Sequence, residues 1–420
     1  MLITNAPKGT KDVLPSESYK WQYIEEKIRQ ICDLYNCNEV RVPTFEHTEL
    51  FLRGVGDNTD IVNKEMYTFL DKAERSITLK PEGTAGVARC FVENSIFNNP
   101  MPIKMYYLNS PVFRYEQPQS GRYREHHQFG VEMFGSDEPT IDAEVISVAM
   151  DVFKKLGVGN LELNINSIGC SECRPKYNAA LLEYIGSSID KMCTSCQERY
   201  EKNPLRILDC KVPTCKEVVK NAPTTIEHLC EDCSEHFERL QKNLDSMGIA
   251  YKVNPQIVRG LDYYTKTVFE IITNSIGAQG TVCGGGRYNN LIEEIGGKPM
   301  PAAGFGMGME RLLMVMENDN VEIPEPKAVD LYIAATEDDA IIKSMEIARK
   351  LRAEGIKVEA PHMKKSLKAQ MKYANKLNCR YVLMLWDEDI KNGEVLVKDM
   401  DENGEEKKIK IDEIVKEINI

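Results

Sequence analysis

The sequence lacks any long run of apolar residues, since no window approaches eighteen of them in succession. A helix that spans a bilayer needs about 20 predominantly apolar residues, so we expect no membrane span. The segment Met1–Pro15 has no basic stretch followed by an apolar one, so no secretory signal is predicted. Internal repeats and low-complexity tracts are also missing, which excludes solenoid and collagen-like chains. These absences predict a packed protein of the cytoplasm.

The chain also lacks an excess of positive charge. Lys and Arg number 53 against 65 Asp and Glu, which gives a net charge of −12. Nucleic acid should therefore not coat the whole surface, although a local basic patch is still compatible with this balance. Hydrophobic residues make up 42% and charged residues 28%, the usual composition of a globular protein. A length of 420 residues predicts roughly three domains.

The character of the sequence changes along the chain. Short alternating apolar runs with Gly and Pro turns predict an α+β domain with antiparallel strands in two parts, residues 1–168 and 243–320. A helical, cysteine-rich insertion at 169–242 interrupts it. Helices are predicted at Ser18–Leu34 and Asp142–Leu156.

A polar, proline-containing stretch at 318–327 is predicted to be a linker. Beyond it, apolar runs alternate with amphipathic helix patterns, which predicts a small α/β domain at 328–420. The predicted runs and helices are 331–335, 339–353, 357–360, 367–377 and 381–385.

A carboxylate and a hydroxyl flank a glycine in the segment Leu79–Gly86. Glu82 and Thr84 lie at a predicted strand-to-helix turn, where they could hold an ammonium group. The alternative is structural, with Thr84 as the N-cap of a helix that spans Ala85–Val92.

The segment Gln128–Phe134 is predicted to be a strand with one polar face. Alternation places Gln128, Gly130 and Glu132 on one face and Phe129, Val131 and Met133 on the other. The polar face has a gap at the glycine, which suits a small polar ligand, whereas the alternative is a solvated edge. Nearby arginines could bind phosphates: Arg114, Arg122 and Arg124.

Glycines are concentrated in two later segments. Gly284, Gly285 and Gly286 follow the polar stretch Val258–Glu270, although a triple glycine alone is weak support for phosphate binding. In the second segment, glycines at 304, 306 and 308 leave one strand face bare, as flat stacking of an aromatic ligand requires. A helix is predicted to follow, with Arg311 in its first turn.

Taken together, these segments resemble the histidyl-tRNA synthetase family of class II aminoacyl-tRNA synthetases. The resemblance covers nearly the whole chain and rests on Pro81-Glu82-Gly83-Thr84, Phe113-Arg114-Tyr115-Glu116, Arg259-Gly260-Leu261-Asp262-Tyr263-Tyr264, Gly285-Gly286-Arg287-Tyr288 and Gly306-Met307-Gly308-Met309-Glu310-Arg311. It implies a class II catalytic domain with a six-stranded antiparallel sheet flanked by helices, and a helical insertion. It also implies a C-terminal α/β anticodon-binding domain and a homodimer.

The resemblance also implies roles for individual residues. The family would bind the α-ammonium of L-histidine with Glu82 and Thr84 and the backbone end with Gln128. It would bind the imidazole with Glu132 and Tyr264, with Tyr263 nearby. For ATP the implied residues are Arg114 and Arg259 at the α-phosphate, Glu116 at the adenine and Arg311 at the γ-phosphate. Arg114 and Arg259, with Mg²⁺, would stabilise the charge that develops when the histidine carboxylate attacks the α-phosphorus.

Two regions are assigned to the tRNA. Many bacterial relatives carry an arginine where this chain has Gln117, and that arginine is thought to recognise the extra 5′ guanosine of histidine tRNA. The sequence therefore does not identify the residue that recognises this nucleotide here. Arg122 lies in the same loop. In the C-terminal domain, Lys365, Lys368 and Lys372 lie on one predicted helix stripe without acidic residues among them. The alternative for these lysines is a solvated helix face.

Eight of the thirteen cysteines fall in the insertion, as Cys170/Cys173, Cys193/Cys196, Cys210/Cys215 and Cys230/Cys233. Closely spaced pairs in a cytosolic protein are typical halves of tetrahedral zinc sites, so up to two structural Zn²⁺ sites are predicted. Reduced thiols that pack as small hydrophobic residues are the alternative. Spacing alone leaves open which pairs share an ion.

Two further functions are compatible with this scaffold. One is a catalytically silent, synthetase-like regulatory subunit of ATP phosphoribosyltransferase. Such proteins generally lack the C-terminal domain and the arginine of the Arg-Gly-Leu-Asp-Tyr-Tyr stretch, whereas this chain has both. The other is a synthetase for proline, threonine or glycine.

Overall fold

The structure is a computed structural model that describes residues 4–56, 59, 61–118, 121–275, 280–326, 329–400 and 405–418. The chain divides into two compact units, Met1–Ile323 and Pro324–Ile420. Each unit has its own sheet and its own hydrophobic core. Within the described ranges, every helix is too short or too polar to cross a membrane.

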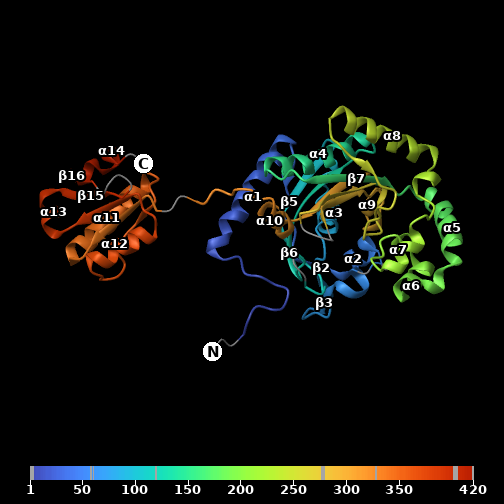
Figure 1. Ribbon diagram of the computed structural model, residues 1–420, viewed down its shortest axis with the longest axis horizontal. Coiled ribbons are helices and arrows are strands. Elements are labelled where there is room, and N and C mark those ends of the chain that lie inside the picture. The colour runs from blue at the N-terminus through green and yellow to red at the C-terminus, as the bar shows by residue number, and fades with distance from the viewer. Residues whose placement is uncertain are drawn as a thin grey trace. The chain divides into compact units, whose positions relative to one another are not determined.

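The first unit is built on an eight-stranded sheet whose six central strands are antiparallel (Figure 1). Their order is β5 (Ile103–Phe113), β6 (Glu125–Phe134), β11 (Ala302–Gly308), β10 (Thr281–Arg287), β9 (Thr265–Thr273) and β7 (Leu161–Ser167). The two-residue strands β1 (Asn38–Glu39) and β8 (Lys252–Val253) pair in parallel at the edges. The predicted antiparallel catalytic sheet is therefore confirmed, and these short edge strands are an addition to it.

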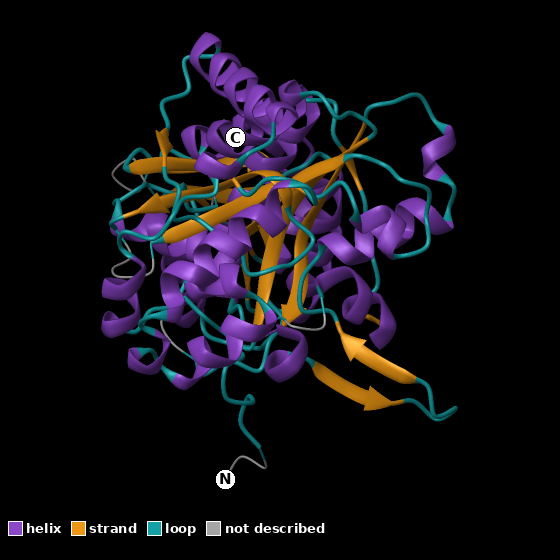
Figure 2. Cartoon of the chain, turned by 90° about the vertical axis from the view of Figure 1, so that its right-hand side faces the viewer, coloured by secondary structure: helices purple, strands orange, loops and turns teal. Residues whose placement is uncertain are grey.

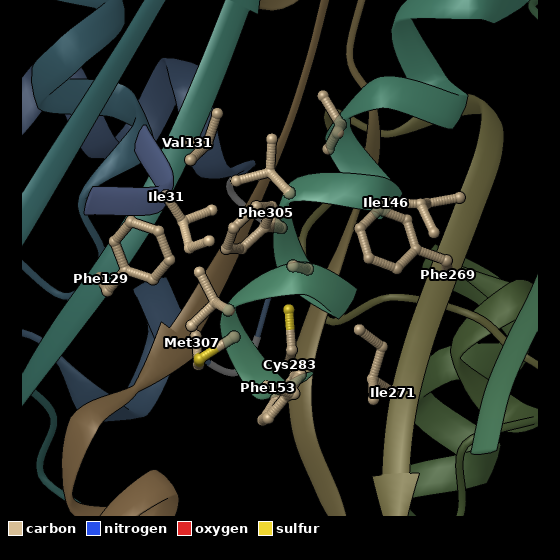
Figure 3. Packing of buried hydrophobic residues seen from close by; sticks show 14 of the residues in the cluster. Ile31, Phe129, Val131, Ile146, Phe153, Phe269, Ile271, Cys283, Phe305 and Met307 are labelled. Atoms are coloured by element: carbon tan, nitrogen blue, oxygen red, sulfur yellow. The ribbon is translucent and has the colours of Figure 1, made fainter. Parts of the chain in front are cut away.

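One face of this sheet packs against long helices and forms the main core. Phe129 and Val131 of β6, Phe305 of β11 and Phe269 of β9 lie in one cluster with Ile146 of α4 (Figure 3). All are nearly inaccessible to solvent, and the two rings Phe129 and Phe305 meet edge to face at 5.3 Å. The helices that cover this face are α1 (Pro15–Leu34), α4 (Pro139–Lys155), α8 (Glu231–Ser246) and α10 (Met309–Asn318).

Both predicted helices of the first unit exist, but each begins three residues earlier than predicted. Helix α1 begins at Pro15 rather than Ser18, and α4 begins at Pro139 rather than Asp142. Proline is favoured in the first turn of a helix because the N–H that it lacks would have no partner there. The apolar periodicity on which the prediction rests starts only after this turn.

The opposite face of the sheet carries a second core and the polar groups described below. Helix α3 (Thr84–Glu93) contributes Val87 and Phe91 to it, and Phe91 stacks on Phe134 with centroids 4.4 Å apart. Helices therefore lie on both sides of the strands (Figure 2). Helices α2 (Thr48–Val55) and α9 (Leu291–Glu294) pack against α3, and β2 (Phe45–His47), β4 (Ser76–Leu79) and β3 (Tyr67–Leu70) form a separate small sheet.

The insertion has a small core of its own. Its helices α5 (Cys173–Gly186), α6 (Thr194–Lys202) and α7 (Pro213–Val219) lie together at one side of the unit (Figure 1). Three of the nine buried residues in this core are cysteines. Helix α8 instead contributes Phe237, Leu240 and Leu244 to the main core, so it anchors the insertion to the sheet.

The second unit is a five-stranded mixed sheet with helices on both faces. The order is β13 (Val358–Glu359), β12 (Leu331–Ala335), β14 (Tyr381–Leu385), β15 (Glu394–Asp399) and β16 (Glu406–Lys410), with the first three parallel. Its helices are α11 (Asp338–Ala353), α12 (Leu367–Lys376), α13 (Asp387–Asn392) and α14 (Ile414–Glu417). The predicted α/β pattern is confirmed, whereas the hairpin β15–β16 was not predicted.

Candidate active site

A cavity of about 180 Å³ opens on the face of the large sheet that lies opposite the main core. Strands β10 and β11 supply Gly284, Gly306 and Gly308 to its wall, and β6 supplies Gln128. Six of the residues predicted for the site line it, namely Arg114, Glu116, Arg122, Gln128, Arg259 and Arg311. Four of these are arginines, so the cavity suits a ligand that carries several negative charges.

Arg259 is held in this cavity by one carboxylate. Its Nη1 lies 2.5 Å from Oε1 of Glu270 on β9. Burial opposes the charge on Arg259, but Glu270 overcomes this and raises the pKa of the guanidinium above its ordinary value. Nε of Arg259 is buried and has no hydrogen-bond partner in the part of the chain that the structure describes. A buried donor without a partner lowers the stability of the fold, so we expect a bound ligand to supply the acceptor for this N–H.

The first residue of the triple glycine makes room for this arginine. A Cβ at Gly284 would lie 2.4 Å from both terminal guanidinium nitrogens of Arg259. Gly285 and Gly286 instead lie against the backbone of the neighbouring strands β11 and β9. The triple glycine therefore serves close packing, and only Gly284 bears on the candidate site.

Two other arginines are fixed to the cavity wall by backbone carbonyls. Arg114 follows β5, and its Nε donates to the carbonyl of Pro81 at 2.8 Å. Arg311, in the first turn of α10, donates to the carbonyls of Thr281 and Gly121. Burial and the neighbouring Arg122 lower the pKa of Arg311. A cluster of positive charges that depresses its own pKa is a site in which anion binding relieves repulsion.

The glycines of β11 differ in what they face. At Gly306 an added Cβ would find no atom closer than 3.8 Å, and the same holds at Gly308. At Gly304 an added Cβ would lie 2.0 Å from Oε2 of Glu132. The predicted bare strand face therefore extends over Gly306 and Gly308 and ends at Gly304, where Glu132 covers it.

Glu132 belongs to a buried polar cluster next to the cavity, on the same strand as Gln128. Its side chain is fully inaccessible, and its two oxygens accept hydrogen bonds from Thr84 Oγ1, at 2.8 Å, and from the hydroxyl of Tyr288. Burial raises the pKa of Glu132 well above its ordinary value. Tyr263 and Tyr264 are buried against Tyr288 with centroids 5.4 and 6.3 Å away. The solvated-edge alternative for this strand is wrong because its polar face is covered.

The gap predicted at Gly130 is not open. A Cβ at Gly130 would lie 2.3 Å from the ring of Tyr107 on β5, and one at Gly83 would lie 2.4 Å from the same ring. The two glycines therefore accommodate an aromatic side chain of the protein itself. The interpretation of the gap as ligand space is wrong, and the space near Gln128 is supplied by Gly306 instead.

Glu82, rather than Thr84, caps helix α3. Helix α3 begins at Thr84, and the carboxylate of Glu82 accepts from the backbone N–H groups of Thr84 and Ala85 at 2.8 and 2.7 Å. The N-cap alternative for Thr84 is therefore wrong, since its hydroxyl donates to Glu132. Burial raises the pKa of Glu82 despite these bonds. Each carboxylate oxygen retains a further lone pair for a ligand.

Two residues of the buried cluster were missed by the sequence interpretation. Tyr288 ends the motif Gly285-Gly286-Arg287-Tyr288, and the run of glycine before it is the signal that could have identified it. Tyr107 carries no local signal, because only the strand pairing places it between Gly83 and Gly130.

The residues assigned to the tRNA are exposed. Gln117 lies in the β5–β6 loop, and Arg122 of the same loop pairs with Glu116 at 3.4 Å. Lys368 and Lys372 project from α12 away from the buried Gln370 and Ala374, and Lys365 precedes the helix. A solvated face and a phosphate-binding face are both compatible with this arrangement.

The eight insertion cysteines gather into two groups of four. Cys170, Cys173, Cys230 and Cys233 form one group, and Cys193, Cys196, Cys210 and Cys215 form the other. Within each group all sulfur atoms lie within 4.8 Å of one another. The structure thereby answers the question of pairing that spacing left open.

Comparison with known proteins decides the family. Residues 9–312 match the family model described as histidyl-tRNA synthetase, and residues 330–419 match an anticodon binding domain. The chain belongs to the histidyl-tRNA synthetase family. A histidine–tRNA ligase of Caldanaerobacter subterraneus subsp. tengcongensis is 58% identical over 417 residues, which are 99% of this chain and 100% of that relative.

Other members of the family agree with this assignment. A histidine–tRNA ligase of Clostridium novyi is 57% identical over 413 residues, covering 98% of each chain. The apo crystal structure of the S. aureus histidyl-tRNA synthetase superposes with a TM-score of 0.84 at 37% identity, covering 99% of this chain and 100% of that one. The class II fold with a C-terminal anticodon-binding domain is thus shared along the whole length.

Proposed function

We propose that the chain ligates L-histidine to its cognate tRNA, first forming histidyl-adenylate from ATP and then transferring histidine to the 3′-terminal adenosine. The observation that carries this is the continuity of the arginine-lined cavity with the buried Glu132 cluster. Gly306 pairs with Gly130 and Gly304 with Glu132 along β6 and β11, so the two lie side by side on one sheet face. An anionic substrate and a small polar one would therefore meet there.

The ATP end of the site is assigned to the cavity. Arg114 and Arg259 would contact the α-phosphate, Arg311 the γ-phosphate and Glu116 the adenine edge. The bare surface at Gly306 and Gly308 supports flat stacking of the adenine. Because the arginines are already fixed by Pro81, Glu270 and backbone carbonyls, they need little reorganisation as charge develops at phosphorus.

The histidine end is assigned to the polar cluster. Glu132 would accept a hydrogen bond from the imidazole, with Tyr264 beside it, while Glu82, Thr84 and Gln128 would bind the amino-acid end. The unsubstituted face of the sheet at Gly306 leads from Gln128 into the cavity. The carboxylate of bound histidine would thus be directed toward the α-phosphorus, which is the geometry that in-line attack requires.

Magnesium would enter with the ATP phosphates. Glu310 lines the cavity, and carboxylate oxygens are the ligands that Mg²⁺ accepts. The tRNA would contact Gln117 and Arg122 near the acceptor end and Lys365, Lys368 and Lys372 in the anticodon-binding domain. We further expect a homodimer and a cytoplasmic location, where ATP and tRNA are available.

The direct test is aminoacylation. Purified protein incubated with ATP, Mg²⁺, radiolabelled histidine and histidine tRNA should yield acid-precipitable label that is lost on mild alkaline treatment, which hydrolyses aminoacyl esters. Omission of ATP is the control. Failure to charge a tRNA that another histidyl-tRNA synthetase charges would overturn the proposal.

A glycine variant should separate ATP binding from folding. A Cβ added at Gly306 meets only ordinary contacts at 3.8 Å or more, so we expect Gly306→Val to change stability little, although its side chain occupies the surface proposed for the adenine. We expect the Michaelis constant for ATP to rise about tenfold or more, while that for histidine changes little. In contrast, Gly304→Ala should lower the melting temperature, since its Cβ would lie 2.0 Å from Glu132. An unchanged ATP constant in Gly306→Val would remove the adenine from this surface.

A further inference from the structure

The cysteine groups have the geometry of metal sites. Cys170 Sγ lies 3.7 Å from that of Cys173 and 3.8 Å from that of Cys230, and Cys193 Sγ lies 3.8 Å from that of Cys210. A tetrahedral zinc with Zn–S bonds of about 2.3 Å requires its sulfur atoms to be about 3.8 Å apart. A disulfide would need sulfur atoms about 2.05 Å apart. The separations therefore fit four ligands around one ion.

Backbone amides already face the sulfur atoms. The N–H of Cys230 donates to Cys173 Sγ at 3.1 Å, and that of Cys193 donates to Cys215 Sγ at 3.2 Å. Bonds of this kind stabilise thiolates and orient metal ligands. Because the insertion core is small and three of its nine buried residues are cysteines, apolar burial alone gives it little stability.

The two sites lie at different places in the insertion. The base site (Cys170, Cys173, Cys230 and Cys233) joins the start of α5 to the start of α8, where the chain leaves the sheet and returns to it. The arm site (Cys193, Cys196, Cys210 and Cys215) lies within the insertion, around α6 and the start of α7.

Residues next to the base-site ligands hold one end of the signature segment, which we define as Arg259–Lys266. Arg174, adjacent to Cys173, donates to the carbonyl of Tyr264. Asp232, between Cys230 and Cys233, pairs with Lys266 at 2.8 Å. The backbone N–H of Lys266 also donates to the carbonyl of Gly169, next to Cys170.

Residues between the arm-site ligands hold the other end. Arg206 Nη1 donates to the carbonyl of Arg259 at 3.1 Å, and Asn203 Nδ2 donates to Asp262 Oδ1 at 2.9 Å. Both donors lie in the stretch between Cys196 and Cys210. Residues of the arm site's stretch thus contact the end of the signature segment that carries Arg259. Residues beside the base site contact the end that carries Tyr264.

We propose that the insertion binds two zinc ions, one in each site, and that they clamp the signature segment from its two ends. The metal part stands on the cysteine geometry alone, whereas the clamp rests on the proposed function because its readout is catalysis. The ions take no part in the reaction. They are positioning groups that act through Arg206 and Asn203 on one side and through Arg174 and Asp232 on the other.

Metal content tests the sites. Protein purified without chelators should contain two equivalents of zinc by elemental analysis. The double variants Cys170→Ser/Cys230→Ser and Cys193→Ser/Cys210→Ser should each retain one equivalent, and Cys90→Ser, a half-buried cysteine outside both groups, should retain two. Cobalt-substituted protein should show the absorption of tetrahedral tetrathiolate Co²⁺, a result that does not depend on any variant folding. Zinc-free wild-type protein, or iron with acid-labile sulfide, would overturn the proposal.

Kinetics of the same variants test the clamp. Loss of the arm site should lower the rate of adenylate formation about tenfold with little change in the histidine Michaelis constant. Loss of the base site should raise the histidine Michaelis constant about tenfold with little change in that rate. Variants that lose one zinc and keep wild-type kinetics would overturn the clamp while leaving the sites in place. Wild-type protein with two zinc ions and no adenylate formation would instead overturn the proposed function.

Discussion

Replacement of Arg259 by histidine should slow histidyl-adenylate formation about a hundred- to a thousandfold, with modest change in the Michaelis constants. The guanidinium is already fixed by Glu270, and its buried Nε has no partner among the described residues. It is therefore preorganised for charge that builds only as the carboxylate attacks, and an interaction that is stronger in the transition state raises turnover rather than binding.

Rapid-quench measurement of the first turnover at saturating ATP and histidine reads this step directly. Arg41→His is a suitable control because Arg41 is exposed and lies just after the edge strand β1, outside the cavity wall. Transfer of histidine from preformed adenylate to tRNA should be much less affected. A near wild-type rate of adenylate formation in Arg259→His would mean that Arg259 is not catalytic.

Glu132→Gln should weaken histidine binding about ten- to a hundredfold, which corresponds to roughly 1.5–3 kcal/mol, and leave ATP binding largely intact. The substitution keeps the size of a side chain that is completely buried between Thr84 and Tyr288. It removes the charged acceptor that the imidazole N–H would use. The loss is therefore expected in the amino-acid site and not in the cavity, where Glu132 is absent from the wall.

Calorimetry with histidine and with ATP separates the two effects. Glu144→Gln is the control, since Glu144 is a partly buried carboxylate on α4 that pairs with Lys104. Loss of a hydrogen bond to a charged group should lower histidine affinity by much more than a factor of about two. An affinity within that factor of wild type would argue against Glu132 as the imidazole acceptor.

Local patterns predicted those parts of the fold that depend on local periodicity. The alternation in Gln128–Phe134 places Phe129 and Val131 in the main core and Glu132 on the opposite face, as the structure confirms. The α/β pattern after residue 330 is confirmed for the same reason. Helix starts were misplaced where the first turn is set by proline rather than by apolar spacing.

Features that depend on contacts distant in sequence could not be predicted. The ring of Tyr107 fills the space beside both Gly83 and Gly130, and no pattern in the sequence around Tyr107 predicts this contact. The partition of the cysteines into two groups requires Cys170 to approach Cys230, sixty residues further along the chain. Glu82 and Thr84 were identified as a pair, but only the buried environment shows that the carboxylate caps the helix while the hydroxyl reaches Glu132.

Activation of histidine on this sheet face is tested most directly by ATP–pyrophosphate exchange with a panel of amino acids. Histidine alone should support exchange, and proline, threonine and glycine should not. Exchange with another amino acid instead would contradict the assignment of Glu132 and Tyr264 to an imidazole. Absence of exchange with every amino acid would contradict the proposed synthetase activity and favour the regulatory alternative.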